Sequence, residues 1–270
     1  MKICLDSGHY EGYNQGKVKT YYEGNIMWKI TNLQKKYLEE YEDVTVVLTR
    51  TEVRKDLSLS NRGAKAKGCD LFLSNHSNAC DTESVDRPVI IYAYDNLNKS
   101  DVFGKKLGQA IQTAMGTKQN YQMMQRKGSN GEYYGVMRSA RANGCPLYYI
   151  VEHGFHTNKA TCDWLLKDSN LEKLVKAEVE VIAKHFGLTK KITSATVTTD
   201  TVKPTATTGM LYEIITDSLN IRKGAGTSYD IVGTVKKGGV YTIVEVNGNW
   251  GKLKSGAGWI SLNSKYVKKK

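Results

Sequence analysis

The sequence predicts an α/β layered domain followed by a small all-β barrel, on three observations. Up to residue 187, short apolar runs alternate with longer amphipathic stretches, which is the pattern of an α/β fold. Residues 188–208 contain nine Thr and no aromatic residue, which predicts an extended, solvated linker. Residues 209–270 contain ten Gly between short alternating runs, which is typical of the hairpins of a small barrel.

Five segments of the first domain predict buried strands, because they are short, apolar and rich in branched side chains. They are residues 3–5, 44–49, 71–75, 89–94 and 147–152. Three longer stretches repeat apolar residues at intervals of three and four, which gives a helix one apolar face. These helices are expected over residues 26–41, 102–115 and 171–186, and Gly187 is the expected C-cap of the last one.

The glycine-rich part predicts five short strands, at residues 219–222, 231–235, 240–246, 250–253 and 259–261. Two dipeptides, Asn247-Gly248 and Ser255-Gly256, are hairpin signals between them. The simplest role for the two tryptophans of these strands, Trp250 and Trp259, is to fill the core of the barrel. Tyr229 and Tyr266 are candidates for the walls of a binding groove.

The positive charge is unevenly divided along the chain. The net charge is +12, and residues 209–270 carry ten basic and four acidic side chains, so this last part holds half of the excess. This balance fits either a basic soluble surface or a module that binds a polyanion such as an anionic cell wall. No basic stripe with interleaved aromatic residues is present, so nucleic acid is not an expected partner.

The apolar runs and the cysteines exclude several classes of protein. The longest apolar runs have about five residues, far short of the ~20 that span a bilayer, so we expect no membrane insertion. Asp6, Gly8 and His9 interrupt the N-terminus too early for a signal peptide. Five Cys without a C-x-x-C pair predict neither a disulfide framework nor a thiolate zinc site, and they fit a reducing cytoplasm. No signal for an oligomeric state is present.

Four polar residues fall at the ends of predicted elements. His9 follows the first strand, His76 and Glu152 each close an apolar strand, and Glu23 begins the first helix. Because ligand sites of open α/β sheets lie at the carboxyl ends of strands, we expect these side chains to converge. Individually each has a simpler reading: a lone His in a loop is usually structural, and a Glu at a helix start complements the helix dipole.

Two imidazoles and a carboxylate are the protein ligands of a catalytic zinc ion, which keeps one position for water. A further carboxylate is needed to carry a proton from water to a leaving amine. The sequence supplies three ligands and one further acid. It contains no H-E-x-x-H, so the helical zinc-protease arrangement is excluded.

Six segments place these residues in a family pattern. They are DSGH (6–9), EGN (23–25), LTRT (48–51), LSLSNR with Gly-Ala (57–64), DLFLSNHSNA (70–79) and VEHGFHTN (151–158). Over roughly residues 1–187, they resemble the zinc-dependent N-acetylmuramoyl-L-alanine amidases of family 3, found in phage endolysins and bacterial autolysins. Two departures are Asn75, where many members carry Ile or Val, and PVIIYAY in place of the family's G-x-E-x-[YF] strand.

The resemblance implies an open mixed sheet flanked by helices, a Zn²⁺ ion held by His9, Glu23 and His76, and Glu152 as the catalytic acid and base. The implied substrate is peptidoglycan, cut at the amide between N-acetylmuramic acid and L-alanine. His153 and His156 lie beside the catalytic position and are interpreted as bystanders.

The segments LNIRKGAGTSYDIVGTVKKGG, NWGKL and GWIS resemble a bacterial SH3-like domain, which implies binding to cell-wall polymers. We therefore expect a zinc amidase domain (1–187), a Thr-rich linker (188–208) and an SH3-like wall-binding domain (209–270). A phage endolysin is expected, held in the host cytoplasm before lysis and acting at the wall, with an autolysin as the second choice. Two alternatives remain, a zinc-dependent stem-peptide peptidase and a non-enzymatic protein that binds polyanions or the cell wall.

Overall fold

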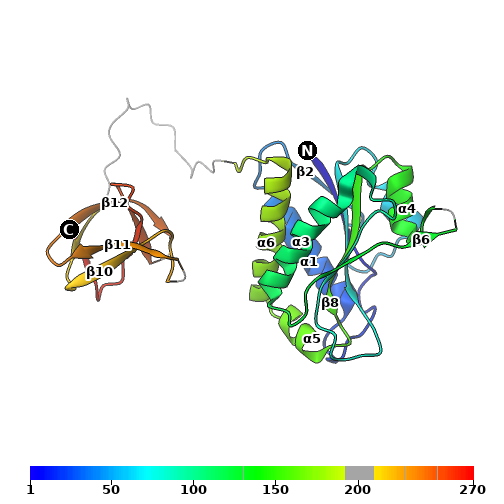
Figure 1. Ribbon diagram of the computed structural model, residues 1–270, viewed down its shortest axis with the longest axis horizontal. Coiled ribbons are helices and arrows are strands. Elements are labelled where there is room, and N and C mark those ends of the chain that lie inside the picture. The colour runs from blue at the N-terminus through cyan, green and yellow to red at the C-terminus, as the bar shows by residue number, and fades with distance from the viewer. Residues whose placement is uncertain (130, 192–209, 228, 248) are drawn as a thin grey trace. The chain divides into compact units, whose positions relative to one another are not determined.

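A six-stranded mixed sheet forms the centre of the first domain (Figure 1). The computed structural model describes all residues except 130, 192–209, 228 and 248. The strands, in sheet order, are β2 (Thr45–Leu48), β1 (Lys2–Ser7), β3 (Leu71–Asn78), β8 (Leu147–Phe155), β4 (Val89–Ile91) and β5 (Gln122–Met124). The first four are parallel to one another, β4 runs antiparallel to β8, and β5 is parallel to β4. The predicted mixed sheet is confirmed.

The five predicted strands are all present, with shifted ends. The central strands β3 and β8 continue three residues beyond the predicted ends, where they pair with each other. The strand predicted over residues 89–94 ends at Ile91. Beyond it, the backbone N–H of Tyr94 donates to the side chain of Glu132 and not to a neighbouring strand. Strand β5 was not predicted, since its three residues are too few to show a period.

Helices cover both faces of the sheet. One face carries the three predicted helices, α1 (Glu23–Leu38), α3 (Ser100–Met115) and α6 (Asp168–Phe186). The other elements of this domain that the sequence did not predict are α2 (Leu59–Ala64), α4 (Gly135–Ala142), α5 (Lys159–Leu165), the 3₁₀ turn Leu97–Lys99 and the hairpin of β6 (Lys127–Gly128) and β7 (Gly131–Glu132). Helices α2 and α4 pack together over the second face.

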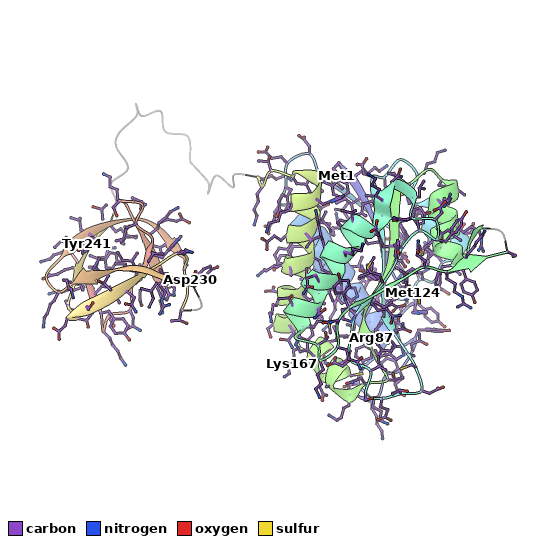
Figure 2. The ribbon with its side chains drawn as sticks, viewed as in Figure 1. Met1, Arg87, Met124, Lys167, Asp230 and Tyr241 are labelled. Atoms are coloured by element: carbon purple, nitrogen blue, oxygen red, sulfur yellow. The ribbon has the colours of Figure 1, made fainter. Side chains whose placement is uncertain are left out.

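Strand alternation divides the core into two layers, because successive side chains point to opposite faces. Leu71 and Leu73 pack towards α1, α3 and α6, whereas Phe72 between them packs towards α4. Figure 2 shows the side chains that fill these layers, with Met124 labelled on the edge strand β5. No described helix is long and apolar enough to cross a membrane.

The chain leaves the first domain later than the end of its last helix. Gly187 caps α6 in the left-handed conformation, at φ 64°, as predicted. Leu188 then packs against the core, Lys190 forms a β-bridge with Tyr41, and the backbone N–H of Lys191 donates to the carbonyl of Glu40 at 2.7 Å. The first residues of the expected linker 188–208 are therefore attached to the first domain. The rest of that segment lies outside the described residues.

The second domain is a seven-stranded antiparallel sheet around one small core. Its strands are β9 (Met210–Ile214), β10 (Ser218–Arg222), β11 (Ile231–Lys236), β12 (Val240–Asn247), β13 (Trp250–Leu253), β14 (Trp259–Ser261) and β15 (Val267–Lys269). The hairpins predicted at both dipeptides are present, as β12 pairs with β13 and β13 with β14. Branched aliphatic side chains such as Ile243 and Ile260 form the buried core, while Trp250 and Trp259 are only half-buried. The two units divide between Thr193 and Ser194.

We predict that a fragment of residues 1–191 is more stable than a fragment of residues 1–187. The shorter fragment loses the packing of Leu188 and several backbone hydrogen bonds, each worth about 1 kcal/mol. For a domain of this size, the Tm should fall by roughly 3–10 °C. Scanning calorimetry of the two fragments measures the difference, and equal Tm values would show that residues 188–191 contribute nothing.

Candidate functional site

His9 reaches the site from the loop after β1. It adopts the left-handed conformation, at φ 57°, and its ring stacks on Tyr13 with centroids 4.5 Å apart. The preceding Gly8 has no room for a side chain, since an added Cβ would lie 2.4 Å from Cε1 of His76. A glycine here therefore lets the two histidines approach each other, with their ring centroids 5.0 Å apart.

Glu23 is the first residue of α1 and lies buried between the two histidines. Its Oε1 is 2.9 Å from Nδ1 of His76, and its Oε2 is 3.3 Å from Nε2 of His9. The backbone N–H of Ser77 donates to Oε1, and the Asn14 side-chain amide donates to Oε2. The helix start comes close to the loop that carries His9, because a Cβ on Gly24 would lie 1.8 Å from the carbonyl oxygen of Tyr10. The carboxylate is thus held by protein donors at the positive end of a helix.

His76 completes a compact group of three possible metal ligands. Nitrogen or oxygen atoms of His9, Glu23 and His76 all lie within 4.8 Å of one another. Two imidazole nitrogens and a carboxylate oxygen fit the donor set of a catalytic zinc ion. The structure therefore brings together the three ligands that the sequence predicted.

The carboxylate and the imidazole strongly perturb each other. Burial works against ionisation of Glu23, but hydrogen bonds and charge from His76 and His9 hold its pKa well below the usual range. Burial likewise disfavours the charged form of His76, yet the Glu23 carboxylate raises the pKa of His76 to about 9. Because metals bind the neutral imidazole, a cation that binds His76 competes with a proton.

Glu152 faces His76 across the pairing of β3 with β8. Burial raises the pKa of Glu152 to about 7, and its buried Oε2 has no hydrogen-bond partner among the described residues. Both residues line a cavity of about 230 Å³, together with Leu59, Tyr134, Gly135, Val136 and Ile150. A buried carboxyl group with a pKa near neutrality can take up and release a proton at this position.

Two family models match the chain. The model described as N-acetylmuramoyl-L-alanine amidase matches residues 3–184, and the model described as bacterial SH3 domain matches residues 217–268. The chain belongs to the N-acetylmuramoyl-L-alanine amidase family. No curated protein matches the chain.

Solved amidase structures share the fold of the first domain. The catalytic domain of CwlV, an N-acetylmuramoyl-L-alanine amidase from Bacillus (Paenibacillus) polymyxa, superposes with a TM-score of 0.60 at 17% identity, covering 70% of this chain and 99% of its own. An N-acetylmuramoyl-L-alanine amidase from Clostridium difficile 630 gives a TM-score of 0.60 at 18% identity, covering 69% and 96%. The CwlD amidase from Clostridioides difficile, solved with the GerS lipoprotein, gives a TM-score of 0.54 at 22% identity. The match covers 69% of this chain and 98% of the CwlD chain.

In this amidase-family domain, Arg62 fixes the loop that carries His9. Its guanidinium is buried, lies 2.9 Å from Oδ1 of Asp6, and donates to the carbonyl oxygens of Ser7 and His9 at 2.6 and 2.8 Å. Arg62 belongs to the LSLSNR segment of the family pattern, to which sequence analysis gave no role. The segment is too polar to suggest burial, so only the family pattern could have drawn attention to it.

His153 and His156, which the sequence analysis interprets as bystanders, are buried outside the cavity that Glu152 lines. His153 Nε2 lies 2.8 Å from Glu178 Oε1 on α6, on the face of β8 opposite to that of Glu152. His156 Nδ1 lies 2.8 Å from the carbonyl oxygen of Ser77 and 4.0 Å from Glu23 Oε2. Neither lines the cavity of Glu152.

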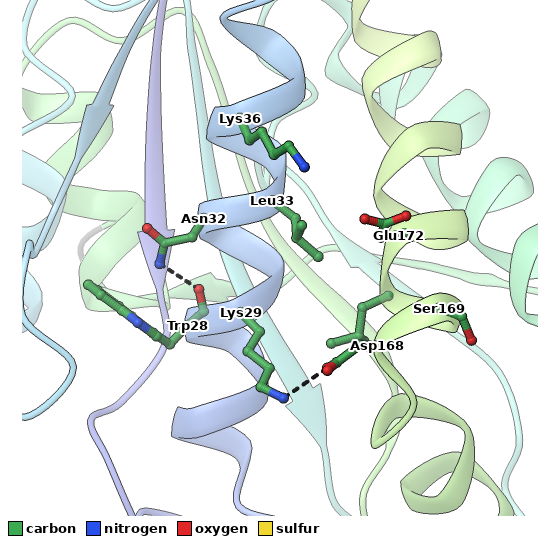
Figure 3. Close-up of a pocket in the computed structure, with 9 residues that line it drawn as sticks. Trp28, Lys29, Asn32, Leu33, Lys36, Asp168, Ser169 and Glu172 are labelled. Atoms are coloured by element: carbon green, nitrogen blue, oxygen red, sulfur yellow. Dashed lines mark hydrogen bonds and ion pairs between the residues drawn. The ribbon is translucent and has the colours of Figure 1, made fainter.

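A larger cavity, of about 720 Å³, lies between α1 and α6 and contains none of these residues (Figure 3). Its walls include Trp28, Leu33 and Glu172, and the ion pair of Lys29 with Asp168 at 2.8 Å closes one side. It offers no titratable group that is both buried and unpaired, so size alone does not identify the reactive site of this family member.

The bacterial SH3 domain has a cavity of its own, of about 280 Å³. Arg222, Trp250 and Tyr266 line it, together with Ser218, Leu219, Asn220, Thr227 and Ser261. Tyr266 is thus one wall of a hollow, as the sequence suggested. Tyr229 instead lies over Gly224, where an added Cβ would be 2.6 Å from its ring.

We predict that Arg62→Met destabilises the amidase domain, because it leaves Asp6 as a buried charge without its cationic partner. Breaking a buried ion pair costs about 3–5 kcal/mol, which lowers the Tm by roughly 6–20 °C. The control is Arg54→Met, since Arg54 pairs with Glu11 at the surface and should change the Tm by less than about 4 °C. Thermal unfolding followed by circular dichroism gives both values, and similar shifts in the two variants would contradict the role assigned to Arg62.

Proposed function

We propose that the chain is a zinc-dependent N-acetylmuramoyl-L-alanine amidase, which hydrolyses the amide between N-acetylmuramic acid and the L-alanine of the stem peptide. One observation carries the proposal. Three side chains with the donor set of a catalytic zinc ion lie within 4.8 Å of one another, and a buried carboxyl with a free oxygen stands beside them. Membership of the amidase family identifies the bond.

His9, Glu23 and His76 would hold the zinc ion. A bound zinc ion supplies Lewis-acid polarisation of a carbonyl and makes water more acidic. Asn14 keeps this ligand set in place, because its side-chain amide lies 2.6 Å from Glu23 Oε2 and 3.2 Å from His9 Nε2. Arg62 acts in the same way through the backbone of His9.

Glu152 would carry the proton. Its carboxylate takes a proton from the attacking water and then gives it to the nitrogen of the departing L-alanine, so the amine leaves as a neutral group. The pKa of about 7 suits both steps, because the group is partly ionised at neutral pH and is still acidic enough to donate.

We also propose that the bacterial SH3 domain holds the enzyme at the cell wall. Three observations support binding to wall polymers. The domain matches the bacterial SH3 family, it has a cavity lined by Arg222, Trp250 and Tyr266, and residues 209–270 carry a net charge of +6. Tethering raises the effective concentration of the catalytic domain at its substrate.

For the biological setting we propose a phage endolysin that is held in the host cytoplasm and acts on the wall at lysis. All five Cys are free, and four of them are buried. Such thiols fit a protein that is made and kept in a reducing compartment.

We predict that Glu152→Gln removes turnover but keeps the metal site. Gln has nearly the same shape and cannot exchange a proton at neutral pH, so activity should fall by about 10²–10⁴-fold. Mass spectrometry of digested wall fragments measures the reaction, and new L-alanine amino termini without freed D-alanine distinguish the amidase from a stem-peptide peptidase. The matched control is Glu172→Gln on α6, at an exposed carboxylate. Near-normal lysis by Glu152→Gln would mean that another group moves the proton.

We predict that His76→Ala loses zinc as well as activity, since a tetrahedral site rarely tolerates the loss of one of three protein ligands. Elemental analysis of the dialysed protein should give about one zinc per wild-type chain and almost none for His76→Ala. His185→Ala, at a histidine on α6 beside Phe103, should keep its zinc. A full equivalent of zinc in His76→Ala would contradict the ligand assignment.

A further inference from the structure

A second cavity, of about 550 Å³, adjoins the catalytic one. It lies where the β6–β7 hairpin meets the start of α4, and Figure 1 shows β6 projecting from the domain beside that helix. Three cationic side chains line it, those of Arg126, Lys127 and Arg138, together with Glu132 and Tyr133. All three cations are exposed to solvent.

Two of the three cations, Arg138 and Arg126, are held in place by neighbouring groups. Nη1 of Arg138 donates to the carbonyl oxygens of Glu132 and Tyr133, at 2.8 and 3.2 Å. The guanidinium of Arg126 stacks 3.5 Å above the ring of Tyr133. Within the described part of the chain, none of the three forms an ion pair with a carboxylate, whereas nearby Arg141 binds Asp95 at 2.9 Å. The cavity therefore presents three exposed cations, whereas the one acidic side chain among the described residues that line it, Glu132, is buried.

The one carboxylate among the described residues that line this cavity, that of Glu132, is buried. Its Oε1 accepts from the Tyr148 hydroxyl and from the backbone N–H of Tyr94. Its Oε2 is buried and has no partner among the described residues. This carboxylate is therefore held by groups of the protein, and the part of the cavity that a ligand can reach is its cationic rim.

This cavity shares a wall with the cavity of Glu152. Tyr133 and Tyr134 have ring centroids 5.1 Å apart, and the first ring lines the cationic cavity while the second lines the catalytic one. An added Cβ on Gly135, in the catalytic wall, would lie 3.6 Å from Nη2 of Arg138. A group bound near Arg138 is thus close to the wall of the cavity that Glu152 lines.

We propose that this cationic cavity binds the free α-carboxylate of the glutamyl residue that follows L-alanine in the stem peptide, and that it selects against stems in which this carboxylate is amidated. The inference rests on the proposed amidase function. In the stem, the glutamyl N–H and α-carboxylate are attached to the same carbon, one residue beyond the scissile amide. The carboxylate meets the Arg126, Lys127 and Arg138 cations. A carboxamide has no charge and gives up the charge-assisted hydrogen bonds.

The test compares two synthetic substrates, N-acetylmuramoyl-L-alanyl-D-glutamate and its D-isoglutamine counterpart, by release of the dipeptide. Wild-type protein should cleave the acid with kcat/KM at least about tenfold higher than the amide, mainly through KM. Arg126→Gln with Lys127→Gln should reduce that ratio to about one, because the acid loses its charge-assisted contacts. Lys106→Gln, which removes an exposed charge on α3, should keep the wild-type ratio.

The outcomes separate this inference from the function on which it rests. Failure to cleave either substrate at the lactyl amide would overturn the proposed function. Cleavage of both at equal rates by wild type, or an unchanged ratio in the double variant, would overturn only the carboxylate site. Arg138→Gln adds a further check and should also lower the ratio. Because Arg138 also donates to two backbone carbonyls, a lower ratio in this variant supports the carboxylate site only if the Tm is unchanged. If the Tm falls, the result of the double variant decides.

Discussion

The structure of the site depends on one buried carboxylate, that of Glu23. An ionised carboxylate is costly to bury unless it is paired and hydrogen-bonded, and this one contacts His9, His76, Asn14 and the backbone of Ser77. These contacts tie the start of α1 to the loop after β1 and to β3. Two glycines make the approach possible, because neither Gly8 nor Gly24 has space for a Cβ. A cation between the imidazoles would compensate the same charge.

The sequence predicted the elements in which a residue pattern extends over several residues. The central strands, the three long helices and the glycine-marked hairpins all carry a pattern of period or of turn residues. Elements without such a pattern were missed. Helix α2 has six residues, and the β6–β7 hairpin has strands of two residues each. Tertiary contacts stabilise these elements, as when Ser139 on α4 donates to the carbonyl of Ser60 on α2.

The site was predictable in its ligands but not in its surroundings. His9 follows β1, and His76 and Glu152 lie in the last few residues of β3 and β8, so the rule that sites lie towards the carboxyl ends of strands is enough to bring them together. Arg62, Asn14 and Tyr134 lie in loops or short helices, where no pattern shows which way a side chain points. The cationic cavity of Arg126, Lys127 and Arg138 depends on the hairpin fold, so a sequence shows only scattered charges there.

Anomalous diffraction from crystals of the zinc-loaded protein, recorded above and below the zinc absorption edge, tests the central claim most directly. The account predicts one strong zinc peak in the amidase domain, bonded to imidazole nitrogens of His9 and His76 and to a carboxylate oxygen of Glu23, at about 2.0–2.2 Å. A protein that takes up no zinc, or a peak bound to other side chains while Glu23 remains paired only with the histidines, would contradict it.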